Sequence, residues 1–493
     1  QGLILLRHGI FTFGADAREA YERMIAMVTR AEARIAAGRA RAFVPAALPD
    51  AIAPLGSVAP ILRGACSLAD PQVEGAFRRL VLDFRTSEAI AAFVNGDDLA
   101  RYAQAGVVTP DHTIRTKNWP LVLPAPAAGA LDAFAVASRT AVADFVARYE
   151  DYFARHNARV GGGRRKLDPL PRVVFVPGLG LFGLGRSKRD AKVAADLAEA
   201  MVESVTGAER IGRFESISEA DMFDVEYWPL EQAKLSGATE KPLAGHIVAV
   251  TGAAGAIGSA TARAFAQAGA EVALLDVDFA GAHEKAKAIG GATAVACDVT
   301  DPVSVRAAFD ELAETFGGVD IAVSNAGAAW QGRIGEVDEA VLRESFELNF
   351  YGHQRVAQNA VRIMRAQGTG GCLLFNVSKQ AVNPGPNFGP YGLPKAATLF
   401  LVRQYALDYG ADGIRANAVN ADRIRSGLLD EDFIRERAAA RGVSEKDYMS
   451  GNLLGREVTA DDVAQAFLAQ ALALKTTGDV TTVDGGNIAA ALR

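Results

Sequence analysis

The stretch of sequence that decides the fold is HIVAVTGAAGAIGSATARAFAQAGAEVALLDVD, residues 246–278. Small apolar residues form a buried-strand pattern that ends at Thr251, and a glycine-rich turn then leads into a helix expected to begin near Ala256. Gly252 supplies a backbone conformation closed to other residues, and Gly258 lets the helix approach the strand closely. The helix N-terminus offers free N–H groups and a positive dipole, so the turn suits a pyrophosphate group.

The carboxylate that follows this turn indicates which dinucleotide would bind. Asp276 ends the next strand, eighteen residues after Gly258, where its side chain can accept hydrogen bonds from adenosine ribose hydroxyls. A carboxylate at that position would repel a 2′-phosphate, so NAD is predicted over NADP. The alternative is a tight turn followed by an aspartate that only caps a helix. Strands and helices alternate from here to the end, which predicts a doubly wound parallel α/β sheet.

Six short motifs follow the glycine-rich turn: CDVTD (297–301), VSNAG (323–327), ELNFYG (347–352), FNVSK (375–379), YGLPK (391–395) and VDGG (483–486). In this order and spacing, residues 244–493 resemble the short-chain dehydrogenase/reductase family. The resemblance implies a Rossmann-type fold with a seven-stranded parallel sheet and an NAD-dependent dehydrogenase. It also implies a cofactor site made by Thr251, Gly252, Gly255, Ile257, Gly258, Asp276, Asp298, Val299, Asn325, Ala326, Gly327, Tyr391 and Lys395.

Two of these residues point to proton transfer. Tyr391 and Lys395 are four residues apart at the start of an expected helix, so their side chains project from one face. To act as a base near neutrality, a tyrosine needs its pKa lowered from about 10 to about 7, which takes ~4 kcal/mol. The adjacent ammonium and the positive nicotinamide ring could supply that stabilisation. Tyr391 would then take the alcohol proton as general base and return it in the reverse reaction.

The resemblance adds two more catalytic candidates. It implies that Ser378 holds the reacting oxygen and that Asn349 positions a water beside the lysine for proton relay. Each has a non-catalytic alternative, since Ser378 could cap a strand end and Asn349 could satisfy a helix kink.

The sequence departs from the family pattern beside the expected substrate site. Ser324 replaces the first asparagine of the family's NNAG motif, and Ala421 and Asp422 stand where most members carry Pro-Gly. Arg423 and Arg425 follow, in the segment that usually shapes the substrate pocket. Either guanidinium could pair with a carboxylate or phosphate, or the segment could be a solvated loop.

The opening stretch, LLRHGIFTFGADAREAY (5–21), resembles the C-terminal part of class II aldolases. In that family a histidine after an apolar strand is the third zinc ligand, and an upstream His-x-His pair supplies the other two. The remaining histidines of this chain form no such pair. His8 is therefore expected to be an orphan ligand of a truncated domain, with zinc bound only in a full-length aldolase half. A buried, hydrogen-bonded histidine is the alternative.

A weak internal repeat connects the first two regions of the chain. HGIFTFGADAREA (8–20) aligns with LGLFGLGRSKRDA (179–191), and both segments lead from an apolar strand into an alanine-rich helix. The repeat predicts a shared local fold, although convergence of a common strand–turn–helix unit is equally open.

Three regions are expected from these patterns. Residues 1–50 are the C-terminal remnant of an aldolase-like domain, 51–240 an α/β middle region that continues that half, and 241–493 the dehydrogenase domain. This arrangement, with PDHTIRTK (110–117) and the segment from 175 to 191, resembles the bifunctional rhamnulose-1-phosphate aldolase/lactaldehyde dehydrogenase group. His112, Arg115 and Lys117 would bind phosphate or lie in a polar surface loop.

That resemblance implies oxidation of lactaldehyde to lactate in rhamnose catabolism, with the aldehyde entering as its hydrate. Two other activities stay open: an NAD-dependent dehydrogenase of a polyol or hydroxy acid, and a lyase activity of a full-length parent. Both related families imply a homo-oligomer, expected to be a tetramer, that acts on a small-molecule substrate.

Composition excludes several other classes of protein. The chain has 493 residues, 50% of them hydrophobic, and a formal net charge of −6, so no basic surface would recruit nucleic acid. Its three cysteines are far apart, which suits a reducing cytosol and predicts a cytoplasmic protein. No apolar run approaches the roughly 18 residues that span a bilayer, so no membrane association is expected. A start at Gln1 inside a strand-like run suggests the back part of a longer protein.

Overall fold

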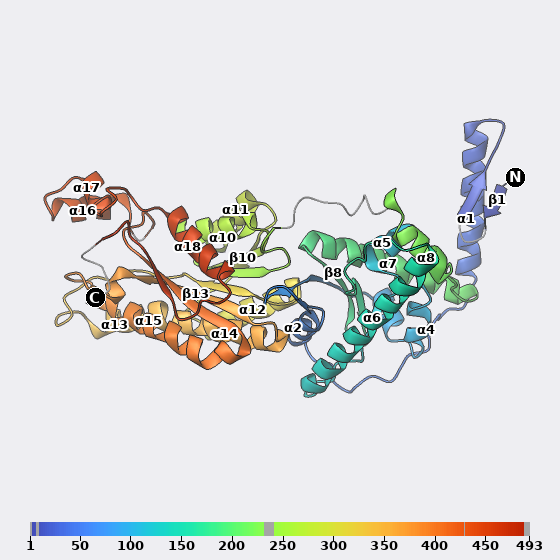
Figure 1. The fold of residues 1–493 in the computed structure, drawn as a ribbon, viewed down its shortest axis with the longest axis horizontal. Coiled ribbons are helices and arrows are strands. Elements are labelled where there is room, and N and C mark those ends of the chain that lie inside the picture. The colour runs from blue at the N-terminus through green and yellow to red at the C-terminus, as the bar shows by residue number, and fades with distance from the viewer. Residues whose placement is uncertain (1, 6–8, 231–240, 428, 488–493) are drawn as a thin grey trace. The chain divides into compact units, whose positions relative to one another are not determined.

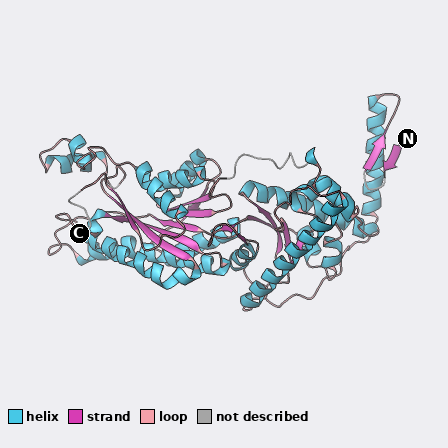
Figure 2. Ribbon diagram, viewed as in Figure 1, coloured by secondary structure: helices cyan, strands magenta, loops and turns pink. Residues whose placement is uncertain are grey.

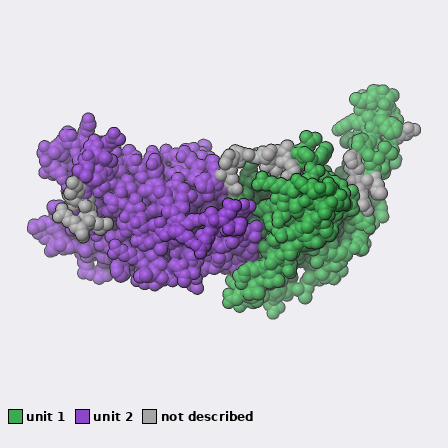
Figure 3. Space-filling model, viewed as in Figure 1, with its two compact units in different colours: residues 1–54, 82–239 green, residues 55–81, 240–493 purple. Residues whose placement is uncertain are grey.

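The computed structural model describes residues 2–5, 9–230, 241–427 and 429–487, and the chain divides into two compact units (Figure 3). Unit 1 comprises residues 1–54 and 82–239, and unit 2 comprises residues 55–81 and 240–493. The predicted dinucleotide site therefore lies within unit 2.

Unit 2 is built on a seven-stranded sheet in the order β11-β10-β9-β12-β13-β14-β15, and every neighbouring pair is parallel. This confirms the predicted Rossmann-type α/β fold (Figure 2). The strands are β9 (Ile247–Thr251), β10 (Glu271–Asp276), β11 (Thr293–Ala296), β12 (Ile321–Ser324), β13 (Gly371–Ser378), β14 (Ile414–Ala421) and β15 (Val480–Val483). The helices are α10 (Ala256–Gln267), α11 (Phe279–Ile289), α12 (Pro302–Phe316), α13 (Glu339–Phe346), α14 (Gly352–Gln367), α15 (Gly389–Tyr409), α16 (Glu431–Ala439), α17 (Glu445–Met449) and α18 (Ala460–Leu472).

Helices cover both faces of this sheet (Figure 1). In β9, Ile247 and Ala249 point into a core shared with α12, α14 and α15, whereas Val248 and Val250 point into a core shared with α10, α11 and α18. Successive side chains of a strand face opposite sides, so a strand covered on both sides must be apolar throughout. The run IVAVT meets that requirement, and all five of its residues are buried.

An earlier segment of the chain, residues 55–81, also belongs to unit 2. It contains α2 (Leu55–Ala65), β3 (Leu68–Ala69) and β4 (Phe77–Arg78), and α2 packs against α12 and α14. Arg63 of α2 is 1% exposed and makes a two-pronged ion pair with Asp320, with N–O distances of 2.9 and 2.7 Å. Unit 2 is therefore assembled from two separate stretches of the chain, which the division at residues 50 and 240 does not anticipate.

Unit 1 contains a four-stranded sheet in the order β5-β8-β7-β6 and a separate hairpin of β1 and β2. Its strands are β1 (Gly2–Leu5), β2 (Gly9–Thr12), β5 (Val81–Arg85), β6 (Leu121–Val122), β7 (Val173–Val176) and β8 (Gly180–Gly185). Its helices are α1 (Ala17–Ala36), α3 (Glu88–Val94), α4 (Leu99–Ala103), α5 (Pro110–Thr116), α6 (Leu131–Arg159), α7 (Lys188–Ile211) and α8 (Glu219–Glu226).

The two copies of the sequence repeat have the same local structure. β2 leads into α1 and β8 leads into α7, as the alignment predicts. Asp16 and Ser187 cap the two helices, and each side chain accepts a hydrogen bond from the backbone N–H three residues later. Both copies are thus strand–turn–helix units with equivalent N-caps.

Two further sequence predictions can be compared with the described part of the chain. All three cysteines, Cys66, Cys297 and Cys372, are buried. Within the residues that the structure describes, no helix is both long and apolar enough to cross a bilayer.

Candidate active site

A cavity of about 480 Å³ lies in unit 2 where the parallel strands end. It is bordered by residues at or just beyond the ends of β9, β10, β12 and β13, the edge at which open α/β sheets bind ligands. The structure brings all but one of the residues of the predicted cofactor site to this cavity: Gly252, Gly255, Ile257, Gly258, Asp276, Asp298, Val299, Asn325, Ala326, Gly327, Tyr391 and Lys395. Thr251 is the exception.

Thr251 supports the cavity wall from behind. Its side chain is buried, and its hydroxyl accepts hydrogen bonds from the backbone N–H groups of Asn325 and Ala326 at 2.9 and 3.2 Å. These bonds tie the end of β9 to the segment after β12. Thr251 therefore shapes the site without lining the cavity.

The glycine-rich turn has the shape that a pyrophosphate needs. Gly252 has a φ of 64°, and a Cβ atom there would lie 2.8 Å from the Cα of Ala326. A Cβ on Gly258 would collide with the carbonyl oxygen of Gly252. α10 begins at Ala256 without a side-chain cap, so its first N–H groups are left for a ligand. The described residues thus fit a dinucleotide.

Asp276 is held at the edge of this turn. Its Oδ2 atom accepts a hydrogen bond from the backbone N–H of Ala254, and its Oδ1 atom accepts one from the N–H of Asp278, both at 2.9 Å. Each carboxylate oxygen can accept a further bond. The carboxylate is thus oriented at the cavity by the backbone and can still receive ribose hydroxyls.

Ser378, Tyr391 and Lys395 line the same cavity. Ser378 ends β13, and its hydroxyl also accepts a hydrogen bond from the N–H of Gln380 at 3.3 Å, so it caps a short turn as well. The Nζ atom of Lys395 lies 5.9 Å from the centre of the Tyr391 ring and donates to the carbonyl of Asn376 at 2.9 Å. The helical spacing therefore places the ammonium beside the phenol, as predicted.

Burial acts against the charges that proton transfer requires. It raises the pKa of Tyr391, an effect opposed by the hydroxyl of Ser378, and it lowers the pKa of Lys395 to about 7. The chain alone therefore does not produce the lowered phenol pKa that the sequence argument requires. Further positive charge in the cavity is needed to stabilise the phenolate.

Asn349 lies directly behind the cavity wall. It is fully buried in a π-helical turn, Glu347–Tyr351, between α13 and α14, and its Nδ2 atom donates to the carbonyl of Ala328 at 2.8 Å. Its Oδ1 atom has no partner among the described residues. A Cβ on Gly327 would lie 2.8 Å from that oxygen and 3.4 Å from the Nζ atom of Lys395. The unpaired oxygen and the ammonium thus approach the same small space, which has the chemistry to hold a water.

One further polar side chain, His353, belongs to this network and is not part of any of the predicted motif roles. His353 is buried, with Nε2 at 3.2 Å from the Nζ atom of Lys395 and Nδ1 at 2.6 Å from the hydroxyl of Ser324. Burial and the neighbouring ammonium hold its pKa well below the usual range, so the ring is neutral and can accept from Lys395. The sequence spacing could have indicated this residue. His353 follows Asn349 by four residues, so on a helix the two side chains project from the same face.

The two arginines predicted near the substrate, Arg423 and Arg425, have different surroundings in the structure. Arg425 is paired with Glu457 and Glu431 at 2.6 and 2.5 Å and does not line the cavity. Arg423 does line it, but its guanidinium donates to the carbonyl of Tyr448 at 2.5 Å. A role for Arg425 in binding a substrate anion is therefore contradicted.

Two polar residues of the PDHTIRTK stretch, His112 and Lys117, do not lie at the surface. His112 is buried, with Nδ1 at 2.8 Å from the hydroxyl of Thr109 and Nε2 at 2.9 Å from the carbonyl of Leu197. Lys117 is also buried, and its Nζ atom donates to the hydroxyl of Tyr149 at 3.1 Å. Both alternatives, a phosphate site and a polar surface loop, are thus wrong for these two residues, because core contacts occupy their polar atoms.

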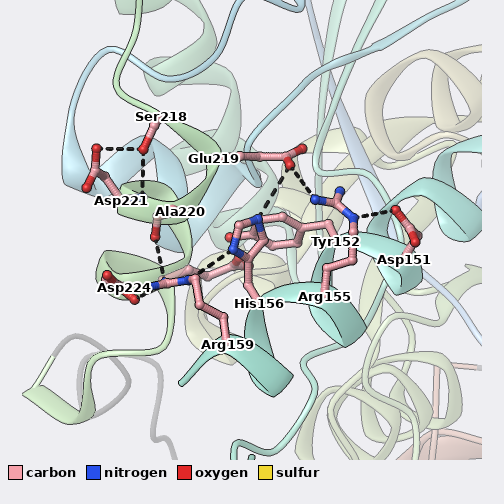
Figure 4. Close-up of polar contacts among 11 residues, drawn as sticks. Asp151, Tyr152, Arg155, His156, Arg159, Ser218, Glu219, Ala220, Asp221 and Asp224 are labelled. Atoms are coloured by element: carbon pink, nitrogen blue, oxygen red, sulfur yellow. Dashed lines mark hydrogen bonds and ion pairs between the residues drawn. The ribbon is translucent and has the colours of Figure 1, made fainter. Parts of the chain in front are cut away.

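The described part of unit 1 holds no group of three side chains suited to a metal ion. His156 of α6 is occupied on both ring nitrogens, by Glu219 of α8 at 3.5 Å and by Arg159 at 3.3 Å (Figure 4). Arg155 binds Glu219 at 3.0 Å and thereby joins the same two helices. The predicted zinc ligand His8 lies outside the described residues.

Two family models match successive parts of the chain, and the first match includes residues 55–81, which belong to unit 2. Residues 53–235 match the family model described as aldolase class II, second domain, and residues 252–487 match the model described as enoyl-(acyl carrier protein) reductase. The chain is 32% identical to a Bacillus subtilis (strain 168) protein named uncharacterized oxidoreductase YuxG, over 100% of this chain and 73% of that protein.

Two other relatives match half of the chain. One is the (-)-isopiperitenol/(-)-carveol dehydrogenase of Mentha piperita, 35% identical over 50% of this chain and 96% of the relative. Another is the galactitol 2-dehydrogenase of Agrobacterium fabrum, 32% identical over 49% of this chain and 96% of the relative. Because such relatives are matched over most of their length, and the site carries the family's motifs, the chain belongs to the short-chain dehydrogenase/reductase family and is an enzyme of the short-chain dehydrogenase type.

Proposed function

We propose that this chain is an NAD-dependent oxidoreductase that oxidises a hydroxyl-bearing carbon of a small substrate. One observation carries the proposal: Ser378, Tyr391 and Lys395 line the same cavity as the uncapped glycine-rich turn and the carboxylate of Asp276. When bound there, the nicotinamide supplies the hydride acceptor.

The side chains then have distinct tasks. Ser378 donates a hydrogen bond to the oxygen that reacts, and Tyr391 takes its proton as the carbon loses a hydride. Lys395, held by Asn376 and His353, stabilises the phenolate with its ammonium group. An alcohol that loses one proton and one hydride becomes a carbonyl compound, and an aldehyde hydrate becomes a carboxylic acid.

The substrate that we propose first is lactaldehyde, which enters as its hydrate and leaves as lactate in rhamnose breakdown. The match of residues 53–235 to a class II aldolase model supports this, since an aldolase reaction releases an aldehyde. No cysteine nucleophile is needed, because the hydrate has the geometry of an alcohol. The second candidate is a polyol or hydroxy acid, which the galactitol-specific name of one relative favours.

A substrate panel tests the proposal. NADH formation is followed with NAD and L-lactaldehyde, galactitol, other polyols and hydroxy acids, and a Tyr391→Phe variant serves as the blank. Lactaldehyde oxidation that vanishes in the variant would support the first candidate. Tyr391-dependent oxidation of only a polyol or hydroxy acid would keep the mechanism and reject the pathway, and no Tyr391-dependent oxidation at all would reject the proposed function.

Removing the charge of Asp276 is expected to weaken the preference for NAD. Asp276→Asn keeps an oxygen for the N–H of Ala254 and abolishes the repulsion of a 2′-phosphate. The ratio of kcat/KM for NAD to that for NADP should fall about tenfold or more, as expected when a hydrogen bond to a charged group is lost. Asp278→Asn, on the exposed cap of α11, is the matched control. An unchanged ratio in Asp276→Asn would contradict the assignment of NAD.

The proposal includes a homo-oligomer. Leu393, Phe400 and Leu407 follow one another at seven-residue intervals along α15, with exposed fractions of 47%, 67% and 79%. Residues seven apart lie on one face of a helix, so these side chains form an apolar stripe that a second copy would cover. Light scattering should give a mass above the 51.8 kDa of one chain, and Phe400→Glu should reduce it. A single-chain mass for the unmodified protein would refute this part of the proposal.

A further inference from the structure

The cavity carries cationic side chains that the proposed reaction does not use. Arg423 and Lys379 share one acid, since Asp422 Oδ2 lies 3.5 Å from the Nε atom of Arg423 and 3.3 Å from the Nζ atom of Lys379. Arg437 and Arg441 also line the cavity, and neither forms an ion pair with any acid in the described ranges. Arg425, in contrast, is paired with two glutamates. Arg437 and Arg441 therefore present two guanidinium groups to the cavity whose charges no described acid neutralises.

Aromatic rings hold these two guanidinium groups in place. The Cζ atom of Arg437 lies 5.0 Å from the centre of the Phe388 ring and 6.0 Å from that of Phe433, and the Cζ atom of Arg441 lies 4.9 Å from that of Tyr448. Stacking on a ring orients a guanidinium but uses none of its N–H donors.

The donors of Arg437 are partly removed from water. Its Nε atom is buried and has no hydrogen-bond partner among the described residues. An unpaired buried donor on a charged group is costly, and a planar anion with two oxygens, a carboxylate or a phosphate, satisfies a guanidinium fork best. The side chain is therefore arranged for an anion that binds from the cavity.

The location assigns this anion to the substrate. Phe388, which stacks on Arg437, immediately precedes α15 and is three residues before Tyr391. Three acids line the cavity wall. Asp276 ends β10 and Asp298 follows β11, whereas Asp422 follows β14 and is already paired with Lys379 and Arg423. The positive groups thus lie with the residues that handle the reacting hydroxyl.

We propose that the cavity selects substrates that carry a carboxylate or phosphate in addition to the hydroxyl that is oxidised, and that Arg437 and Arg441 bind this anion. The inference rests on the proposed oxidoreductase function and narrows its substrate class. Of the two candidate substrates it favours the hydroxy acid over lactaldehyde, since lactaldehyde carries neither a carboxylate nor a phosphate. A neutral polyol of the same length would leave both guanidinium groups unpaired.

Matched substrate pairs test the inference. The pairs are 3-hydroxybutyrate with 1,3-butanediol for the carboxylate, and glycerol 3-phosphate with glycerol for the phosphate. We expect kcat/KM to be at least about tenfold higher for one of the anionic members, and Arg437→Gln to reduce that ratio by a factor of about 10 to 100. Arg435→Gln, on the exposed side of α16 and paired with Asp432, should leave the ratio unchanged.

A preference for the neutral member of both pairs would overturn the inference, and so would an unchanged ratio in Arg437→Gln. If Arg437→Gln raised only the KM for NAD, the arginines would belong to the cofactor site and the inference would also fail. A second measurement does not depend on turnover. Acetate or inorganic phosphate should raise the thermal transition of the unmodified chain and not that of Arg437→Gln. If no substrate of any kind is oxidised but this protection is seen, the anion site stands and the oxidoreductase function fails; absence of protection would count against the site.

Discussion

Tyr391→Phe is expected to reduce kcat by a factor of about 10² to 10⁴ while the chain still binds NAD, because general acid–base catalysis contributes rate factors of that size. The substitution removes only the hydroxyl that takes the proton and keeps the ring beside Lys395. The glycine-rich turn and Asp276 are untouched, so the dissociation constant for NAD should change little. Initial rates of NADH formation and a fluorescence titration with NAD measure the two quantities.

The pH dependence provides a second readout for Tyr391. Burial raises the pKa of this phenol, so the phenolate is populated only at the alkaline side and kcat for oxidation should rise with pH in the unmodified enzyme. The residual rate of Tyr391→Phe should lack that rise. Tyr409→Phe, at the far end of α15 and stacked on Tyr405, is the matched control and should retain full activity. A variant that keeps a tenth of the original kcat would show that another group takes the proton.

The fold of unit 2 was predictable because its signals are local. The run from Ile247 to Asp276 encodes strand, turn, helix and strand within thirty residues, and each glycine has a steric reason that holds in any member of the fold. The pair of Tyr391 and Lys395 was predictable for the same reason, since four residues on a helix fix two side chains on one face.

The unpredicted features depend on contacts between residues far apart in the chain. Arg437 reaches the cavity from α16 and stacks on Phe388, 49 residues earlier, and no periodicity within α16 indicates this. Arg425 was, with Arg423, a candidate from its position in the sequence, but Glu457 and Glu431 neutralise Arg425 in the folded chain. Whether an arginine of this region is paired with an acid or left available for a ligand depends on how the folded chain packs. No local pattern in a single sequence shows that.

Breaking the buried ion pair between Arg63 and Asp320 is expected to be the most damaging single change to the stability of unit 2. Arg63 also donates to the carbonyls of Leu80 and Gly245 at 2.7 and 2.8 Å, and Asp320 accepts from the N–H of Ile247 at 2.8 Å. Arg63→Met would leave the buried charge of Asp320 with one cationic partner, Arg79 at 3.1 Å, and lower the free energy of unfolding by about 3 kcal/mol, the lower end of the range for a broken buried pair. Calorimetry measures this on the transition of unit 2, which is identified as the one that NAD is expected to raise.

The dependence on pH separates loss of the ion pair from loss of packing. Burial disfavours the charged form of Asp320, but Arg63 and Arg79 outweigh it and hold the pKa of this carboxyl well below its usual value. A lowered carboxyl pKa stabilises the fold above the unfolded-state pKa of about 3.9, and this contribution is lost as pH falls below it. Since Arg63→Met reduces the lowering, the difference from the unmodified chain should shrink below about pH 4. Arg343→Met, which breaks an exposed pair with Glu339, should change stability by less than about 0.5 kcal/mol. A deficit in Arg63→Met that stays constant with pH would mean that α2 is held by packing alone and that the charge of Asp320 contributes nothing to joining residues 55–81 to the dehydrogenase unit.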